Sequence, residues 1–229
     1  MLDAAENATD GRATRWDAHK AQRRLEVLDA AVELIEAEGP AIGVKQIADR
    51  VGLPRPVVYR HFRDRDDLDE QIRARVIEKL MRDLAPSLSP EGTVGAAVDR
   101  AVRTYLGWIE AHPKLHHFLG TGAKAERAGG GSKIVSSTKT AIAVQVSGLF
   151  GLALSRIDTD PALAEPLAFG LVGLVDATVN RWLTDPNRRQ TPAALADFLT
   201  SSILHLIIGH LADLGVEVTP DMPVADLLG

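Results

Sequence analysis

The side chains best suited to specific chemistry lie in the span IGVKQIADRVGLPRPVVYRHF, residues 42–62. Arginine can bond guanine edges and phosphates, a methyl-bearing side chain can contact thymine, and a phenol or imidazole can reach phosphate oxygens. Residues of these types follow one another near the end of the span: Arg55, Val57, Tyr59, Arg60 and His61. Pro56, which lies among them, is a further candidate contact. Together they predict a surface that contacts duplex DNA.

Charge is distributed unevenly along the chain. The sequence has 26 basic and 31 acidic residues, and the resulting net charge of -5 by itself argues against a polyanionic partner. Within residues 44–62, however, four basic residues stand against one acid, so the local net charge is +3. The basic residues are Lys45, Arg50, Arg55 and Arg60. This local patch favours DNA as the partner, and Lys45 is therefore a predicted contact.

The residues between these side chains predict two short helices joined by a tight turn. Ala48 is small enough for two helices to cross closely, and Gly52 can adopt the positive φ that the turn requires. Pro54 and Pro56 suit the first turn of the second helix, where an N–H group has no intrahelical partner. The predicted shared core consists of Ile47, Val51, Leu53 and Val58. This arrangement is a helix-turn-helix.

The span resembles the helix-turn-helix of the tetracycline-repressor (TetR) family of bacterial regulators. That family has a motif of the type I-A-x-x-x-G-(V/L)-x-x-x-x-(V/L)-Y-x-(H/Y)-F, followed by a basic residue and a leucine. The matching positions are Ile47, Ala48, Gly52, Leu53, Val58, Tyr59, His61, Phe62, Arg65 and Leu68. Gly43 departs from the family, which usually has a phosphate-touching Ser or Thr there. Arg65 replaces the usual lysine, which keeps the charge and changes its geometry.

The resemblance implies a homodimer that binds a pseudo-palindromic operator in double-stranded DNA, with Arg65 added to the contacts. A purely structural helical corner is the competing interpretation, and the aromatic and basic residues favour DNA over it. Further basic residues precede the motif: Arg12, Arg15, Lys20, Arg23 and Arg24. They form either an arm that touches DNA or the solvated start of a helix.

Nearly every segment between glycine or proline breakers repeats its apolar residues at spacings of three and four, and none alternates as a strand does. We therefore expect an all-α fold of about nine helices. The expected ranges are 16–38, 44–51, 54–61, 66–85, 93–112, 114–119, 132–154, 161–183 and 192–214. The expected domains are a flexible basic N-terminal arm (1–15), a helix-turn-helix DNA-binding domain (16–64) and a C-terminal ligand-binding and dimerisation domain (65–229).

Composition excludes several classes of protein. The chain is 45% hydrophobic and 25% charged, as an ordinary globular protein is, and it has no cysteine for disulfides, iron–sulfur clusters or thiol catalysis. The first ten residues hold three acids and no base, unlike a secretory signal. The segment 141–154 is weakly polar but too short to span a membrane. A cytoplasmic protein with no membrane partner is expected.

A small-molecule effector site is predicted in the middle helices. Tyr105, Trp108 and His112 share one helix face, which core packing alone could explain, but their polar tips also suit a mostly apolar ligand pocket. The remaining candidate ligand contacts are Phe118, Gln145, Phe169 and Asp176. Asp176 lies among apolar neighbours and needs a polar partner, either a ligand or a second subunit, and the subunit interface is favoured.

Metal and catalytic sites are not expected. The histidines His112, His116 and His117 are spaced in part as metal ligands, but Pro113 interrupts the helix and no third convincing ligand is near in sequence. No motif indicates a catalytic residue or a cofactor. The alternatives to a DNA-binding regulator are a helical small-molecule-binding protein with a degenerate DNA-binding domain, or a helical enzyme.

The last two long helices are the predicted homodimer interface. Their apolar stripes are Leu167, Leu171, Leu174 and Thr178 in one helix, and Leu199, Ile203, Leu206, His210 and Leu214 in the other. The second helix has apolar residues on all sides, which a four-helix bundle with a second subunit would bury. The sequence therefore predicts a homodimeric, ligand-responsive transcriptional regulator. Of the two signs of regulation, which the sequence leaves open, repression is favoured over activation.

Overall fold

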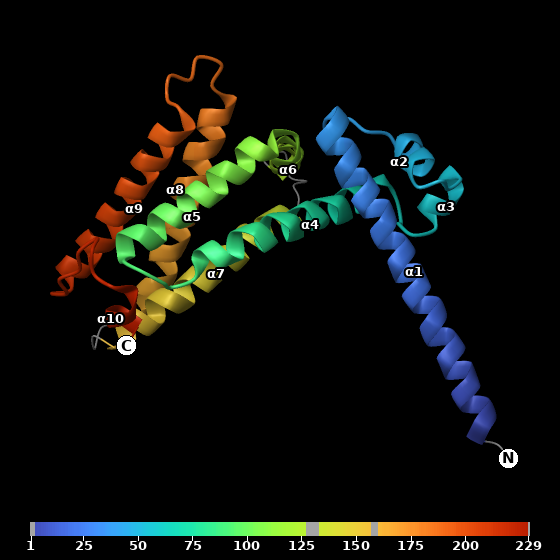
Figure 1. The fold of residues 1–229 in the computed structure, drawn as a ribbon, viewed down its shortest axis with the longest axis horizontal. Coiled ribbons are helices and arrows are strands. Elements are labelled where there is room, and N and C mark those ends of the chain that lie inside the picture. The colour runs from blue at the N-terminus through green and yellow to red at the C-terminus, as the bar shows by residue number, and fades with distance from the viewer. Residues whose placement is uncertain (1–2, 127–132, 157–159, 229) are drawn as a thin grey trace. The chain divides into compact units, whose positions relative to one another are not determined.

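The computed structural model describes residues 3–126, 133–156 and 160–228 (Figure 1). Over these ranges the chain forms ten α-helices, two short 3-10 turns and no strand. The helices are α1 (Asp3–Glu38), α2 (Val44–Arg50), α3 (Arg55–Tyr59), α4 (Arg65–Leu84), α5 (Val94–Ala111), α6 (Pro113–Glu126), α7 (Lys133–Arg156), α8 (Ala164–Thr184), α9 (Pro192–Asp213) and α10 (Val224–Leu228). The predicted all-α class is confirmed.

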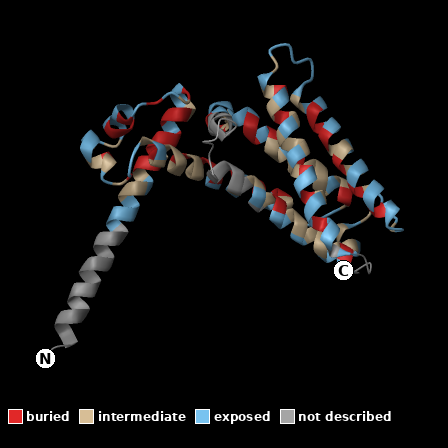
Figure 2. Cartoon of the chain, turned by 180° about the vertical axis from the view of Figure 1, so that it is seen from behind, coloured by how far each residue is buried: buried red, intermediate tan, exposed pale blue. Residues whose placement is uncertain are grey.

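The helices belong to two compact units. The first unit comprises residues 1–78 and 112–135, and the second comprises residues 79–111 and 136–229. The first unit therefore contains α6 and most of α4 as well as the helix-turn-helix segment. Each unit has its own apolar core, seen as the red inward faces of its helices in Figure 2.

The core of the first unit is built from one face of α1, the two short helices and α4. Leu28, Val32 and Ile35 of the predicted α1 stripe are buried, whereas Leu25 is 40% exposed. The α4 side chains that complete this core are all fully buried: Leu68, Ile72 and Val76. Burying such side chains stabilises the fold by roughly 1.5–3 kcal/mol each. The helix-turn-helix is thus fixed on a rigid support.

Helix α1 begins at Asp3, earlier than the predicted start at Trp16. The segment predicted as a flexible arm, residues 1–15, is therefore helical from Asp3 onward. No proline interrupts the segment, and it contains four alanines, the residue with the highest helix propensity. The side chains of Arg12 and Arg15 lie outside the described residues.

In the second unit α5 packs along α9, as Figure 1 shows. The inward stripe of α9 consists of Leu195, Leu199, Ile203, Ile207 and Leu211. Of the stripe predicted to face a second subunit, Leu199 and Ile203 are buried within the chain. Leu206 and Leu214 are exposed, so they stay predicted interface residues. Arg103 of α5 bonds Asp197 of α9 at 2.5 Å, which ties the two helices together beside this core.

The C-terminal segment returns to the start of α5. The amide nitrogens of Val94 and Gly95 donate to the carbonyl oxygens of Met222 and Pro220 at 2.9 and 2.7 Å. These bonds satisfy donors at the beginning of α5 that have no partner within the helix. The five-residue helix α10 that follows was not predicted, because so short a helix lacks a readable apolar period.

By length and composition alone, α9 is apolar enough to cross a membrane, and 33% of its most apolar window is buried within the chain. This helix was predicted as residues 192–214, but residues 141–154 were taken as the longest weakly polar stretch. The core helix of a soluble protein passes the same test, so this property is weak support for a membrane span. The buried stripe that α9 packs on α5 accounts for part of its apolar character.

Candidate nucleic-acid interface

The turn between α2 and α3 has the geometry that the sequence predicts. Gly52 has a φ of +66°, in the left-handed region that glycine adopts without steric cost. The amide nitrogen of Leu53 donates to the carbonyl oxygen of Ala48 at 2.9 Å, which closes the turn. Ala48 and Val58 are buried where the helices cross, at 2% and 0% exposure. The turn therefore fixes the direction of α3.

The start of α2 is capped without the hydroxyl that relatives of the motif usually have. The amide nitrogen of Gly43 donates to Oε1 of Gln46 at 2.7 Å, and Nε2 of Gln46 donates to Glu38 at the end of α1 at 2.7 Å. This side chain performs half of a capping box and also links two helices. Gly43 itself offers only its backbone to a phosphate.

Helix α3 presents its polar side chains outward. It begins at Arg55 and ends at Tyr59, shorter than predicted at both ends, although His61 still donates its amide to the Val58 carbonyl at 3.0 Å. Arg55 and Pro56 are exposed, while Val57 and Tyr59 are half-buried. Nη2 of Arg55 lies 3.5 Å from the Tyr59 hydroxyl, and its guanidinium lies over the ring.

The basic residues of this surface divide into paired and unpaired groups. Arg50 forms an ion pair with Glu33 of α1 at 2.9 Å. In the described part of the chain, Lys45, Arg55 and Arg60 are exposed and form no ion pair. Three cations that no neighbouring carboxylate neutralises are thus available to phosphates, despite the negative net charge of the chain.

His61 follows α3 and lies near basic residues from the middle of α1. Its Nδ1 is buried, and it has no hydrogen-bond partner among the described residues. Burial and then the charges of Lys20, Arg24 and Arg23 lower the pKa of His61 below its usual value. The lowered pKa favours the neutral imidazole, which can offer a phosphate an N–H donor.

Arg65 is occupied within the fold. Its Nη2 donates to the carbonyl oxygen of Ile42 at 3.0 Å, and its Nε donates to Asp69 at 3.0 Å. These bonds join the first turn of α4 to the segment that leads into α2. Arg65 was predicted to contact DNA. Its role in positioning these two segments was not predicted.

The middle of α1 adds basic residues near the motif. Lys20 and Arg24 are close enough to His61 to shift its pKa, and the Arg24 guanidinium lies 5.2 Å from the centre of the Phe62 ring. Phe62 is 4% exposed and fills the space beneath α3 as predicted. The basic surface therefore continues from α3 onto the described part of α1.

The candidate ligand contacts of the second unit are brought together only in part. Burial and the nearby charge of Asp176 raise the pKa of Tyr105, so the two side chains lie close to one another. Asp176 accepts bonds from Lys139 at 2.7 Å and from Asn180 at 2.9 Å. Asp176 was predicted to pair with a ligand or a second subunit. Within the chain it pairs instead with Lys139 of α7. Lys139 lies 37 residues away in the chain, and no motif signals the pairing.

The other candidates have different environments. Trp108 is 5% exposed, whereas Gln145 is exposed and Phe169 is 39% exposed. His112 and Phe118 belong to the first unit, where His112 bonds Glu36 of α1 and the Arg73 guanidinium lies over the Phe118 ring at 5.0 Å. Their grouping with Tyr105 as one pocket stays a prediction. Among the described residues no cluster of three potential metal ligands occurs.

Two parts of the chain match known protein families. Residues 27–72 match the family described as bacterial regulatory proteins, tetR family. Residues 94–206 match the tetracyclin repressor-like C-terminal domain. The first match covers the helix-turn-helix, and the second covers α5 to α8 and most of α9.

Individual proteins are similar over most of the chain. The uncharacterized HTH-type transcriptional regulator Rv0472c of Mycobacterium tuberculosis H37Rv is 28% identical over 84% of this chain and 80% of its own. The HTH-type transcriptional activator FasR of Mycolicibacterium smegmatis is 23% identical over 72% of this chain and 74% of its own. A crystal structure of a tetR-family transcriptional regulator from Streptomyces coelicolor has a TM-score of 0.63 and 24% identity, over 91% of this chain and 87% of that one.

Proposed function

The chain belongs to the tetR family of bacterial regulatory proteins, and we propose that this DNA-binding transcriptional regulator is a repressor released from its operator by a small, mostly apolar ligand. The observation that carries the proposal is the outward surface of α2 and α3. Lys45, Arg55 and Arg60 are exposed there beside the Gly52 turn, without carboxylate partners in the described residues. Repression requires only that the bound protein exclude polymerase from overlapping DNA.

The DNA partner is a pseudo-palindromic operator read by a homodimer. Two recognition helices related by a two-fold axis read half-sites about 34–36 Å apart, or a multiple of that spacing. Exposed apolar side chains of α8, of α9 and of the residue that follows α9 support an interface through these two helices: Phe169, Leu206 and Leu214.

The effector contacts lie in the second unit. Tyr105 carries a phenol in a largely buried environment close to Asp176, and Trp108 follows it on the same helix. A few polar groups among apolar side chains are typical of small-molecule sites. The ligand would bind Tyr105 and Trp108, and the Lys139–Asp176 ion pair would set the charge of that site. No catalytic residue, cofactor or metal is assigned.

An activator is the second candidate function, because the similar protein FasR bears that name. Both functions use the same DNA-binding surface, so the sign of regulation depends on where the operator lies relative to the promoter. Either role requires the compartment that holds the DNA, which supports a cytoplasmic location.

The deciding experiment selects bound sequences from a random pool of duplex DNA with the full-length protein. We expect one pseudo-palindromic sequence to be enriched. A compound screen for release from that sequence then tests the effector, and transcription in vitro from a promoter carrying it tests the sign. If no sequence is enriched, the proposed regulator function is contradicted. If the protein increases transcription, it is an activator and not a repressor.

A further inference from the structure

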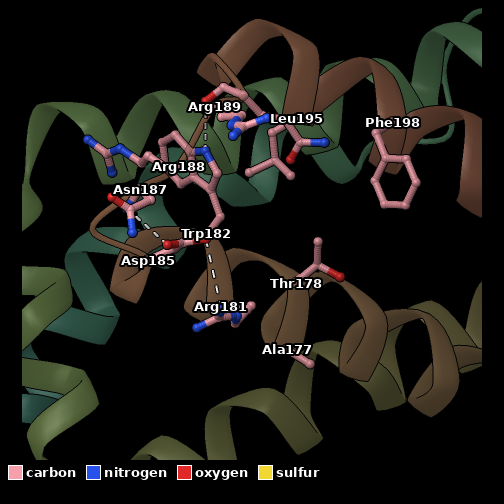
Figure 3. A pocket seen from close by; sticks show the side chains of 11 residues that line it. Ala177, Thr178, Arg181, Trp182, Asp185, Asn187, Arg188, Arg189, Leu195 and Phe198 are labelled. Atoms are coloured by element: carbon pink, nitrogen blue, oxygen red, sulfur yellow. Dashed lines mark hydrogen bonds and ion pairs between the residues drawn. The ribbon is translucent and has the colours of Figure 1, made fainter.

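A pocket of about 710 Å³ lies at the corner of the second unit where α8 ends and α9 begins (Figure 3). Its floor is apolar: Trp182 is 7% exposed and Leu195 is 1% exposed. Phe198, which is 50% exposed, stands at one end of the pocket, away from Asn187 and Asp185. Sites for small molecules commonly have volumes of about 300–1,000 Å³ and mostly apolar linings. The corner pocket therefore has the size and lining for a small organic molecule.

The connection between the two helices is held in place by its own hydrogen bonds. Trp182 Nε1 donates to the carbonyl oxygen of Gln190 at 2.9 Å. The amide nitrogen of Asn187 donates to Oδ1 of Asp185 at 3.0 Å, and that of Arg188 donates to the Asp185 carbonyl at 3.3 Å. The pocket wall is thus formed before any ligand binds, which lowers the entropy lost on binding.

The rim of the pocket is basic. Arg181, Arg188 and Arg189 line it together with one carboxylate, Asp185, so its formal charge is +2 in a chain of net charge -5. Arg181 lies 3.8 Å from Asp185, whereas Arg188 and Arg189 form no ion pair within the described residues. The Arg188 guanidinium lies 4.5 Å from the centre of the Trp182 ring, which orients it above the apolar floor.

We propose that this corner pocket binds an organic anion with a flat apolar body. The body would lie between Trp182 and Phe198, and its carboxylate or phosphate group would bond the guanidinium groups of Arg188 and Arg189. Planar guanidinium groups match both anions with paired hydrogen bonds. Neither Tyr105 nor Asp176 lines this pocket, so the site is separate from the effector contacts proposed above.

Calorimetric titration of the full-length protein without DNA tests the proposal. The probes are 1-naphthoate, 1-naphthyl phosphate and the neutral 1-naphthamide, which share one ring system. We expect at least one anion to bind at least tenfold more tightly than the amide. The preferred anion then distinguishes a carboxylate ligand from a phosphate ligand.

Variants locate the bound anion. The R188Q/R189Q double variant should bind it at least tenfold more weakly. The single variant R189Q should lose part of that affinity. Because it keeps the Arg188–Trp182 contact, it leaves the pocket wall intact. R82Q is the matched control, because Arg82 is an exposed arginine of α4 in the same unit that does not line the pocket.

Three results would overturn the proposal. They are the absence of measurable binding by either anion, equal affinity for anion and amide, and equal affinity in the double variant and R82Q. Operator binding is measured separately and does not depend on these outcomes.

Discussion

The guanidinium carbon of Arg55 lies 5.6 Å from the centre of the Tyr59 ring, one helical turn further along α3. Both side chains face outward, and the ring restricts the positions that the guanidinium can take. An arginine held on an aromatic face is oriented for paired hydrogen bonds to a guanine edge. The phenol beside it can reach a phosphate. Arg55 is therefore expected to read a base, and Tyr59 to position the helix on the backbone.

Replacing Arg55 by alanine should relax the base preference at one position in each half-site. The expected cost on the preferred operator is about 1–3 kcal/mol. Tyr59→Phe removes only the hydroxyl and should weaken all sequences alike. Sequence selection followed by affinity measurement on matched operators checks both. An unchanged base preference in Arg55→Ala would exclude the base-reading role.

Operator affinity should fall steeply and log-linearly with salt concentration despite the net charge of -5. The reason is that Lys45, Arg55 and Arg60 displace counterions from the DNA locally. Truncation before Ala18 removes Arg12 and Arg15 and should flatten the slope if this segment touches phosphates. The control R82Q should keep the full slope. An identical slope after truncation would show that the segment is only a solvated start of α1.

The helix-turn-helix was predictable because local requirements fix it. Gly52 must have positive φ, Phe62 must fill the space beneath α3, and both demands concern residues close together in sequence. The spacing of a few residues therefore specifies the turn, the buried side of α3 and its outward side. The cap of α2 was harder to predict. Gly43 has no side-chain hydroxyl, and the side chain of Gln46 bonds the Gly43 amide instead.

The second unit was less predictable because its contacts join distant helices. The ion pair between Lys139 and Asp176 links α7 and α8, and neither sequence neighbourhood signals it. In α9 the apolar residues lie on all sides of the helix, so their spacing does not indicate which side faces the core. Adjacent Leu206 and Ile207 are 40% and 6% exposed, a difference that only the packing against α5 decides.

The stability of the first unit should depend on the protonation of His61. Because its pKa is lowered in the folded chain, the unfolded chain binds the proton more tightly. The stabilisation is therefore complete above the ordinary histidine pKa of about 6.5 and is lost as the pH falls from there through the folded pKa. Thermal unfolding from pH 8 to pH 5 should show a smaller decline for His61→Gln than for the wild type. Equal declines would exclude this contribution.

The dimer interface should be sensitive to charge on the outer face of α9. Leu206→Glu would bury a carboxylate between subunits and should shift the protein toward monomer. Leu25→Glu is the matched control, because Leu25 in α1 is also 40% exposed. Analytical ultracentrifugation at several concentrations measures the shift. Dimers of equal stability in both variants would exclude an interface through this face of α9.

Ligand response should depend on the Tyr105 hydroxyl. The compound selected for operator release should bind beside Tyr105 and Trp108 and should weaken operator affinity about 5–150-fold, a coupling of about 1–3 kcal/mol. By linkage, operator DNA should weaken binding of the compound by the same factor.

Tyr105→Phe keeps the ring and its packing, so it should reduce affinity for the selected compound while the affinity of the free protein for the operator stays near the wild-type value. Trp108 is one of three tryptophans, and replacing Trp16 and Trp182 by phenylalanine leaves it as the single indole reporter. Its fluorescence should then change on titration with the compound, because a ligand beside the ring alters its environment. Unchanged fluorescence together with an unaltered response in Tyr105→Phe would place the effector elsewhere. Loss of operator binding and of helical structure in Tyr105→Phe would instead identify the phenol as a core residue.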